Sequence, residues 1–140
     1  WYSTIPCGSW NTIDGGYVKS IKINGVWTCS ASMHEKTIAQ KTIKWCINRL
    51  GLSRIRNLNI LMEISTLKDC WGTCEEGNKD RSYIITIDSG QSIRNYVMTI
   101  VHEMIHVKQY VRNEWTGDGE KEAEKLEEKL ADELWKENIL

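Results

Sequence analysis

The chain has 140 residues, of which 41% are hydrophobic, and this size suits one domain with a single modest core. Lysine and arginine number 18 against 19 aspartates and glutamates, so the formal net charge of -1 gives no global attraction to nucleic acid or anionic lipid. No apolar run approaches the roughly 18 residues that span a membrane, and no signal peptide is recognisable. We therefore expect a soluble protein without a nucleic-acid or membrane partner, and the oligomeric state stays open.

The N-terminal part predicts an irregular arm followed by a β-hairpin. The arm is rich in Ser, Thr, Gly and Asn. Residues 17–29 alternate between apolar and polar side chains and contain Asn24-Gly25, a dipeptide typical of two-residue hairpin turns. We expect residues 1–31 to form an extension and residues 32–140 to form the main domain.

The next segment predicts a helix and then a sheet. Ser32 and Glu35 have the spacing of a capping box, apolar residues recur at helical spacing after them, and Gly51 ends the pattern. Three runs with strand character follow, at residues 57–65, 68–74 and 81–88. Strands that follow one another directly favour a small antiparallel or mixed sheet packed on the helix, hence an α+β fold.

Two further helices are predicted in the C-terminal half. Ser89 and Ser92 are candidate N-caps for a helix over residues 93–112, whose apolar residues surround nearly the whole helix. This distribution is typical of a central, buried helix. A last helix over residues 120–140 carries leucines on one face and charged residues on the others.

The buried helix contains the motif His-Glu-x-x-His at His102, Glu103 and His106. Side chains four residues apart lie on one helical face, so the two imidazoles can bind one metal ion. Glu103 lies about 100° around the helix from His102, where it can reach a water molecule rather than the metal. The competing interpretation is a pair of hydrogen-bonded core histidines, but burying two histidines and a glutamate together is costly without a metal. The motif indicates a zinc site with a general base.

A catalytic zinc ion takes three protein ligands, so a third must be found. His34 is the other histidine, but its place in the first turn of the first helix favours a surface or cap role. A carboxylate at the start of the last helix is the alternative. Glu120 and Glu122 both lie at the edges of the predicted buried face, and the helical pattern alone does not choose between them.

The motif followed by Glu122-Ala123 resembles the gluzincin pattern, in which the glutamate directly before the alanine is the third zinc ligand. The wider stretch is similar to small phage-encoded metallopeptidases of the SprT-like or minigluzincin kind. The similar segments are Tyr83-Ile-Ile-Thr-Ile-Asp88, Thr99 to Tyr110, and Glu120-Lys-Glu-Ala123. The resemblance implies a zincin-like fold, one catalytic zinc ion on His102, His106 and Glu122, and hydrolysis of peptide bonds in a peptide or protein substrate. It also implies a virus-encoded protein that acts in the host cell or the virion.

Further roles follow from this hypothesis. Glu103 would act as the general base, and Tyr110, one turn past His106, is a candidate donor to the oxyanion, with a structural role as its alternative. The strand over residues 81–88 resembles the zincin edge strand, along which an extended peptide could pair. Trp71 and Trp115 are candidates to line the cleft.

The five cysteines leave at least one thiol unpaired. Cys7 with Cys29, and Cys70 with Cys74, are possible disulfides in an oxidising compartment. Free thiols and a metal site at Cys70 and Cys74 are the alternatives.

Two functions of other classes compete with peptidase activity. In the first, zinc only braces the helices of a binding module. In the second, the N-terminal arm and hairpin dock a virion interaction protein onto its partner. The first predicts a closed fourth coordination position and no chelator-sensitive activity, and the second predicts stable binding to a partner that survives the loss of Glu103.

Overall fold

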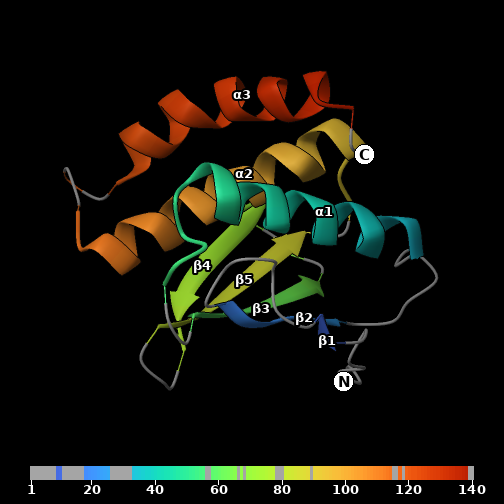
Figure 1. Ribbon diagram of the computed structural model, residues 1–140. Coiled ribbons are helices and arrows are strands. Elements are labelled where there is room, and N and C mark those ends of the chain that lie inside the picture. Colours follow the sequence, from blue (N-terminus) through green and yellow to red (C-terminus); the bar gives the residue numbers. More distant parts are fainter. Residues whose placement is uncertain are drawn as a thin grey trace.

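The computed structural model describes residues 9–10, 18–25, 33–55, 58–65, 67, 69–77, 81–88, 90–114, 117 and 119–138. Within these ranges it contains three helices and five strands (Figure 1). In chain order the elements are β1 (Ser9–Trp10), β2 (Val18–Gly25), α1 (Met33–Arg49), β3 (Leu58–Ser65), β4 (Gly72–Glu76), β5 (Ser82–Asp88), α2 (Ile93–Arg112) and α3 (Glu120–Lys136). None of these helices is long and apolar enough to cross a membrane.

The strands form one mixed sheet in the order β1-β2-β3-β5-β4. The pairs β2-β3 and β3-β5 are parallel, and the two outer pairs are antiparallel. Along β3 and β5 every second side chain is buried, because one face of the sheet is covered and the side-chain period of a strand is two. Figure 1 shows the three helices on that one face. The predicted α+β class and mixed sheet are therefore confirmed.

Helix α2 lies between the sheet and α3 (Figure 1). It begins after Ser92, whose side chain accepts a hydrogen bond of 3.4 Å from the amide of Asn95, and it ends at Asn113, which has a left-handed backbone (φ 52°). Apolar side chains lie on nearly every face of α2, because α1, α3, β4 and β5 all pack against this helix. The predicted central helix is confirmed, and three of its buried residues are polar: Glu103, His106 and Gln109.

The hairpin predicted at Asn24-Gly25 is wrong. Both residues lie within β2 and pair with β3, Asn24 with Glu63 and Gly25 with Ile64. The Asn-Gly signal describes local turn preference only, whereas parallel pairing along the whole of β2 keeps the backbone extended. Residues 26–30 lie outside the described part of the chain. Strands β1 and β2, which we assigned to an extension, thus belong to the same sheet as β3.

The edge strand is also different from the prediction. Strand β5, over the predicted residues 81–88, lies inside the sheet between β3 and β4, and β4 is the last strand in the order. The sequence placed a strand at residues 68–74, and the structure has it at Gly72–Glu76. Only one face of β4 packs against a helix and its last residues are exposed, so its sequence lacks the clear alternation that reveals a strand.

Candidate metal centre

Two histidines of α2 direct their imidazole rings toward one place beside the helix. His102 and His106 are one helical turn apart, so their side chains share a face. Their ring centroids are 4.9 Å apart and their Nε2 atoms are 3.2 Å apart. The structure therefore brings together the two histidines that the motif predicts as ligands.

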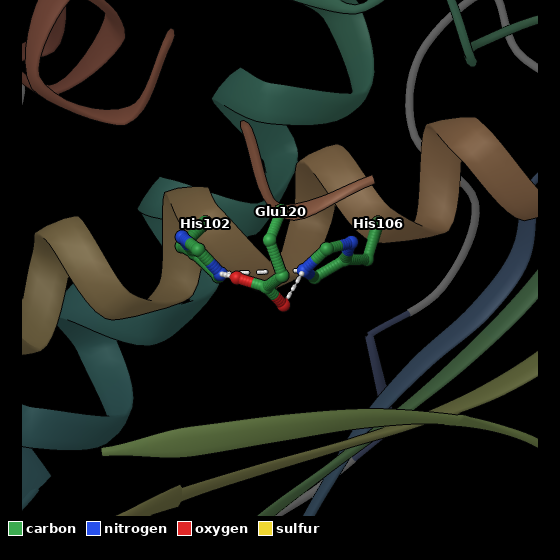
Figure 2. Close-up of side chains that lie close together, drawn as sticks. All are labelled: His102, His106 and Glu120. Carbon is green, nitrogen blue, oxygen red and sulfur yellow. Dashed lines mark hydrogen bonds and ion pairs between the residues drawn. The ribbon is translucent and has the colours of Figure 1, made fainter. Parts of the chain in front are cut away.

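A carboxylate from α3 completes the group. Glu120, the first residue of α3, has Oε2 3.1 Å from Nε2 of His102 and Oε1 2.9 Å from Nε2 of His106. Figure 2 shows this carboxylate between the two rings. One ligand atom from each of the three residues lies within 4.8 Å of the others, so the group could hold a metal ion.

Glu122, the third ligand that the gluzincin resemblance implies, lies elsewhere. Two residues along a helix rotate a side chain by about 200°, so Glu122 and Glu120 point in different directions. Oε1 of Glu122 accepts a hydrogen bond of 2.8 Å from Nε2 of Gln109, and Oε2 is 3.8 Å from Nζ of Lys108. The structure thus places the alternative ligand, Glu120, with the histidines, and not Glu122.

The distances between the ligand atoms suit a small tetrahedral ion. Bonds from zinc to nitrogen or oxygen are about 2.0–2.1 Å long, and the tetrahedral angle then places neighbouring donors about 3.3 Å apart. The Nε2 atoms of His102 and His106 are 3.2 Å apart, close to this value, and with one oxygen of Glu120 the three ligand atoms lie within 4.8 Å of one another. Imidazole nitrogen and carboxylate oxygen are also among the donors that zinc prefers. The residues present therefore fit the metal that the motif indicates.

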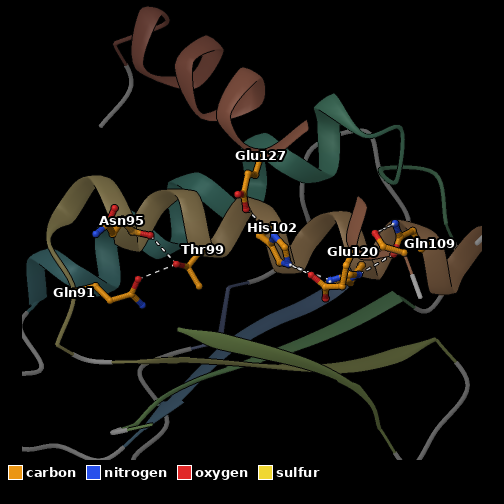
Figure 3. Close-up of polar contacts among 9 residues, drawn as sticks. Gln91, Asn95, Thr99, His102, Gln109, Glu120 and Glu127 are labelled. Carbon is orange, nitrogen blue, oxygen red and sulfur yellow. Dashed lines mark hydrogen bonds and ion pairs between the residues drawn. The ribbon is translucent and has the colours of Figure 1, made fainter. Parts of the chain in front are cut away.

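The second ring nitrogen of each histidine faces an oxygen acceptor. Nδ1 of His102 is 2.6 Å from Oε2 of Glu127, and Nδ1 of His106 is 2.8 Å from Oε1 of Gln109 (Figure 3). Gln109 is oriented in turn, because its Nε2 donates to the carbonyl oxygen of Gly119 at 2.9 Å. A neutral ring that donates from Nδ1 keeps the lone pair of Nε2 for a metal. With a metal bound at Nε2, Glu127 and Gln109 would therefore orient the two rings through Nδ1.

Glu103 is buried beside the two histidines. It is 4% exposed, and its charge interacts with that of His106. Burial is the main cause that raises its pKa to about 7; His106 lowers the pKa, and the carboxylates of Glu120 and Glu127 raise it. A carboxyl group that titrates near neutral pH can both accept and release a proton, which is what a general base and acid must do.

Strand β4 passes very close to Glu103 at Gly72. A Cβ atom at position 72 would lie 2.7 Å from Cγ2 of Thr99 and 3.2 Å from Oε2 of Glu103. Contacts under 3.0 Å are essentially never seen for real Cβ atoms, so a side chain at position 72 would force Thr99 or β4 to shift. The carboxylate of Glu103 therefore lies against the backbone of the edge strand.

A cleft of about 600 Å³ opens beside these residues. Its walls are residues 69–74, which lead into β4, the face of α2 between positions 99 and 110, and the start of α3. His102, Glu103, His106 and Glu120 all line it. The candidate metal ligands and the candidate base thus face one shared space that a substrate could enter.

Two aromatic residues that the sequence singled out line the same cleft. Tyr110 does so while its ring stacks on Tyr83, with the centroids 5.6 Å apart. Its pKa is raised, mainly by burial and then by the nearby Cys74 and Glu76. Trp71 is 60% exposed at the cleft. Trp115 lies outside the described residues.

The described cysteines are free thiols. Cys46 is buried, Cys74 is half-buried and Cys70 is exposed. The predicted bridge between Cys70 and Cys74 is therefore absent, and neither residue belongs to the group that could hold a metal. Cys7 and Cys29 lie outside the described residues, as does the side chain of His34.

Two residues that support the histidines were not predicted. Glu127 is seven residues after Glu120, nearly two full turns, so both carboxylates lie on the same face of α3. Gln109 is three residues after His106 and lies on the same face of α2. Helical spacing could have indicated both residues once Glu120 was known as a ligand.

A comparison of the sequence with protein-family models and with curated proteins gives no match.

Proposed function

We propose that this chain is a zinc-dependent metallopeptidase with a zincin-like fold, and specifically an endopeptidase. The observation that carries the proposal is the convergence of His102, His106 and Glu120 at one cleft, with Glu103 buried beside them. Histidines prepared at Nδ1 for metal binding, an adjacent carboxylate and an open cleft are the parts that hydrolysis of a peptide bond needs. The minigluzincin resemblance of the sequence supports the same chemistry.

Each residue has a distinct task in this proposal. His102, His106 and Glu120 would hold the metal, which when bound supplies Lewis acidity toward water and the substrate carbonyl. Glu103 accepts a proton as water attacks the carbonyl carbon and delivers it to the departing amine. Its burial favours uptake of the proton, because desolvation penalises the charged carboxylate and raises the pKa of Glu103 in the metal-free protein. Tyr110 is the candidate to donate a hydrogen bond to the oxyanion.

Strand β4 is the proposed surface for substrate pairing. It is the last strand in the sheet order and three of its residues, Gly72, Thr73 and Cys74, line the cleft. An extended peptide can form backbone hydrogen bonds with the unpaired edge of such a strand. This arrangement would bring a peptide bond beside Glu103.

A metal that only braces the fold is the second candidate. The observation that favours it is that the candidate ligands belong to two helices, the histidines to α2 and Glu120 to α3. A bound ion would therefore link these helices. This alternative needs no proton transfer. It therefore predicts that Glu103 can be replaced without loss of function.

The decisive experiment compares wild type with Glu103→Gln. We expect both proteins to retain about one zinc ion per chain by elemental analysis. The variant should hydrolyse an unfolded protein substrate about 10²–10⁴ times more slowly, as is typical when an acid or base is removed. Cleavage by the variant at the wild-type rate, or a zinc-loaded wild type that cleaves nothing, would contradict the proposal.

A further inference from the structure

The charged side chains that line the cleft all carry negative charge. They are Asp69, Glu103, Glu120, Glu124 and Glu127, and no lysine or arginine lines the cleft among the residues that the structure describes. The net charge of the whole chain is only -1, so this accumulation is local. On the edge strand beyond the cleft, Glu75 and Glu76 are exposed and add to it. A local field of one sign attracts substrate segments of the opposite sign.

A bound metal does not cancel this charge. A divalent ion brings two positive charges, which Glu120 as ligand and Glu103 as base balance, while the two histidines bind as neutral rings. Glu124, Glu127 and Asp69 remain as excess negative charge along the walls. Of these, Glu127 is engaged with His102, whereas Glu124 is exposed and Asp69 is exposed. The last two are therefore the side chains that a substrate can meet.

An aromatic surface lies at the same end of the cleft as Asp69. Trp71 is 60% exposed, although its backbone is firmly held: its carbonyl oxygen accepts hydrogen bonds from the amide of Asp88 at 2.8 Å and from Nε2 of Gln91 at 3.0 Å. An exposed indole on an ordered backbone, next to carboxylates, attracts the ammonium or guanidinium group of a basic side chain. The exposed indole of Trp71 thus indicates a basic ligand independently of the number of carboxylates.

We infer that the cleft selects polypeptide segments with lysine or arginine near the scissile bond, and that Glu124 is a specificity-determining residue. The inference rests on the proposed peptidase function. Basic side chains would lie between the wall formed by α3, which carries Glu124, and the segment that carries Asp69 and Trp71. The same carboxylates would disfavour acidic segments through repulsion.

The test uses three unstructured peptides that are identical except at the residues flanking the cleaved bond. These residues are Arg and Lys in the basic peptide, Gln in the neutral peptide and Glu in the acidic peptide. We expect kcat/KM of zinc-loaded wild type to be highest for the basic peptide and lowest for the acidic one, with about a tenfold range that narrows as salt is added. Glu124→Lys should lower kcat/KM for the basic peptide about three- to tenfold, mainly through KM. The matched control is Glu128→Lys, an exposed position on the same helix that does not line the cleft, and it should change kcat/KM less than twofold.

Binding is measured in parallel with the Glu103→Gln variant, so that charge preference can be judged without cleavage. Equal kcat/KM and equal Kd for the three peptides, or equal effects of the two lysine variants, would overturn the charge selectivity while leaving the peptidase proposal intact. If no peptide is cleaved by the zinc-loaded wild type but the basic peptide binds most tightly, the peptidase proposal fails and the preference for basic segments stands.

Discussion

At the scale of single residues, the position of Glu103 depends on a residue that has no side chain. Gly72 allows β4 to run against the carboxylate, and any Cβ atom there would contact both Thr99 and Glu103. The sequence marks Gly72 only as a glycine within the strand predicted over residues 68–74. Its importance comes from the approach of two elements that are distant in the chain, which no local pattern describes.

We predict that Gly72→Ala retains zinc but hydrolyses substrate about 10–100 times more slowly, because small displacements of a catalytic group have effects of this size. Adding Thr99→Ser removes Cγ2, the atom nearest to the new methyl group, but keeps the hydroxyl that contacts Gln91 and Asn95. The double variant should regain stability in urea denaturation without regaining the full rate. Gly90→Ala is the control, since its Cβ would have only an ordinary contact of 3.6 Å with Asp88. Full recovery of the rate by Thr99→Ser would mean that Gly72 matters for packing alone.

The pKa of Glu103 gives a second prediction, for the metal-free protein. Because burial raises this pKa from 4.5 to about 7 in the folded state, the folded protein binds more protons than the unfolded chain between these values. The contribution of Glu103 to the free energy of unfolding is therefore fully present below about pH 4.5. It is lost as the pH rises through 7, by on the order of 2–4 kcal/mol. In the presence of a chelator, Glu103→Gln should match wild type in urea denaturation at pH 5 and exceed it at pH 8. A difference between the two proteins that is the same at both pH values would contradict this assignment.

At the scale of elements, the pairing of α2 with α3 decides which glutamate can reach the metal. Gly119, the N-cap residue of α3, is buried and has a left-handed backbone (φ 82°). Its carbonyl oxygen accepts a hydrogen bond from Gln109 of α2. This contact sets the position of the first turn of α3, so that Glu120 faces the histidines and Glu122 faces Gln109. The helical pattern could not identify which of the two glutamates is the third ligand, because both lie near the edge of the apolar face.

We therefore predict that Glu120→Ala weakens zinc affinity at least 100-fold, since a ligand is removed. Glu122→Ala should weaken it by about tenfold or less, because this residue acts only through Gln109 on the ring of His106. Competition with a chromophoric chelator measures both affinities, and Glu128→Ala serves as the exposed control on the same helix. A larger loss for Glu122→Ala than for Glu120→Ala would restore the ligand set that the gluzincin resemblance implies.

At the scale of the whole molecule, the strand order creates the cleft. Because β4 occupies the edge beside α2, its residues and the segment before it form one wall, and α3 contributes to the opposite side. We expected residues 81–88 at the edge, because that run resembles the zincin edge strand. A clear alternating pattern instead belongs to β5, which has neighbours on both sides, while the true edge strand is short and polar at its end.

Several elements could be predicted because they depend on local physics alone. The helices α1 and α2, the strands β3 and β5, and the proximity of His102 to His106 follow from a period of 3.6 or two and from the four-residue spacing. The same periodicity predicts the last helix, which ends at Lys136 rather than at the predicted residue 140. Three features could not be predicted: the extended course of β2 through Asn24-Gly25, the edge position of β4 and the choice of Glu120 over Glu122. Each of these depends on which distant segments pair, and that outcome reflects the packing free energy of the whole domain rather than the preference of any short segment.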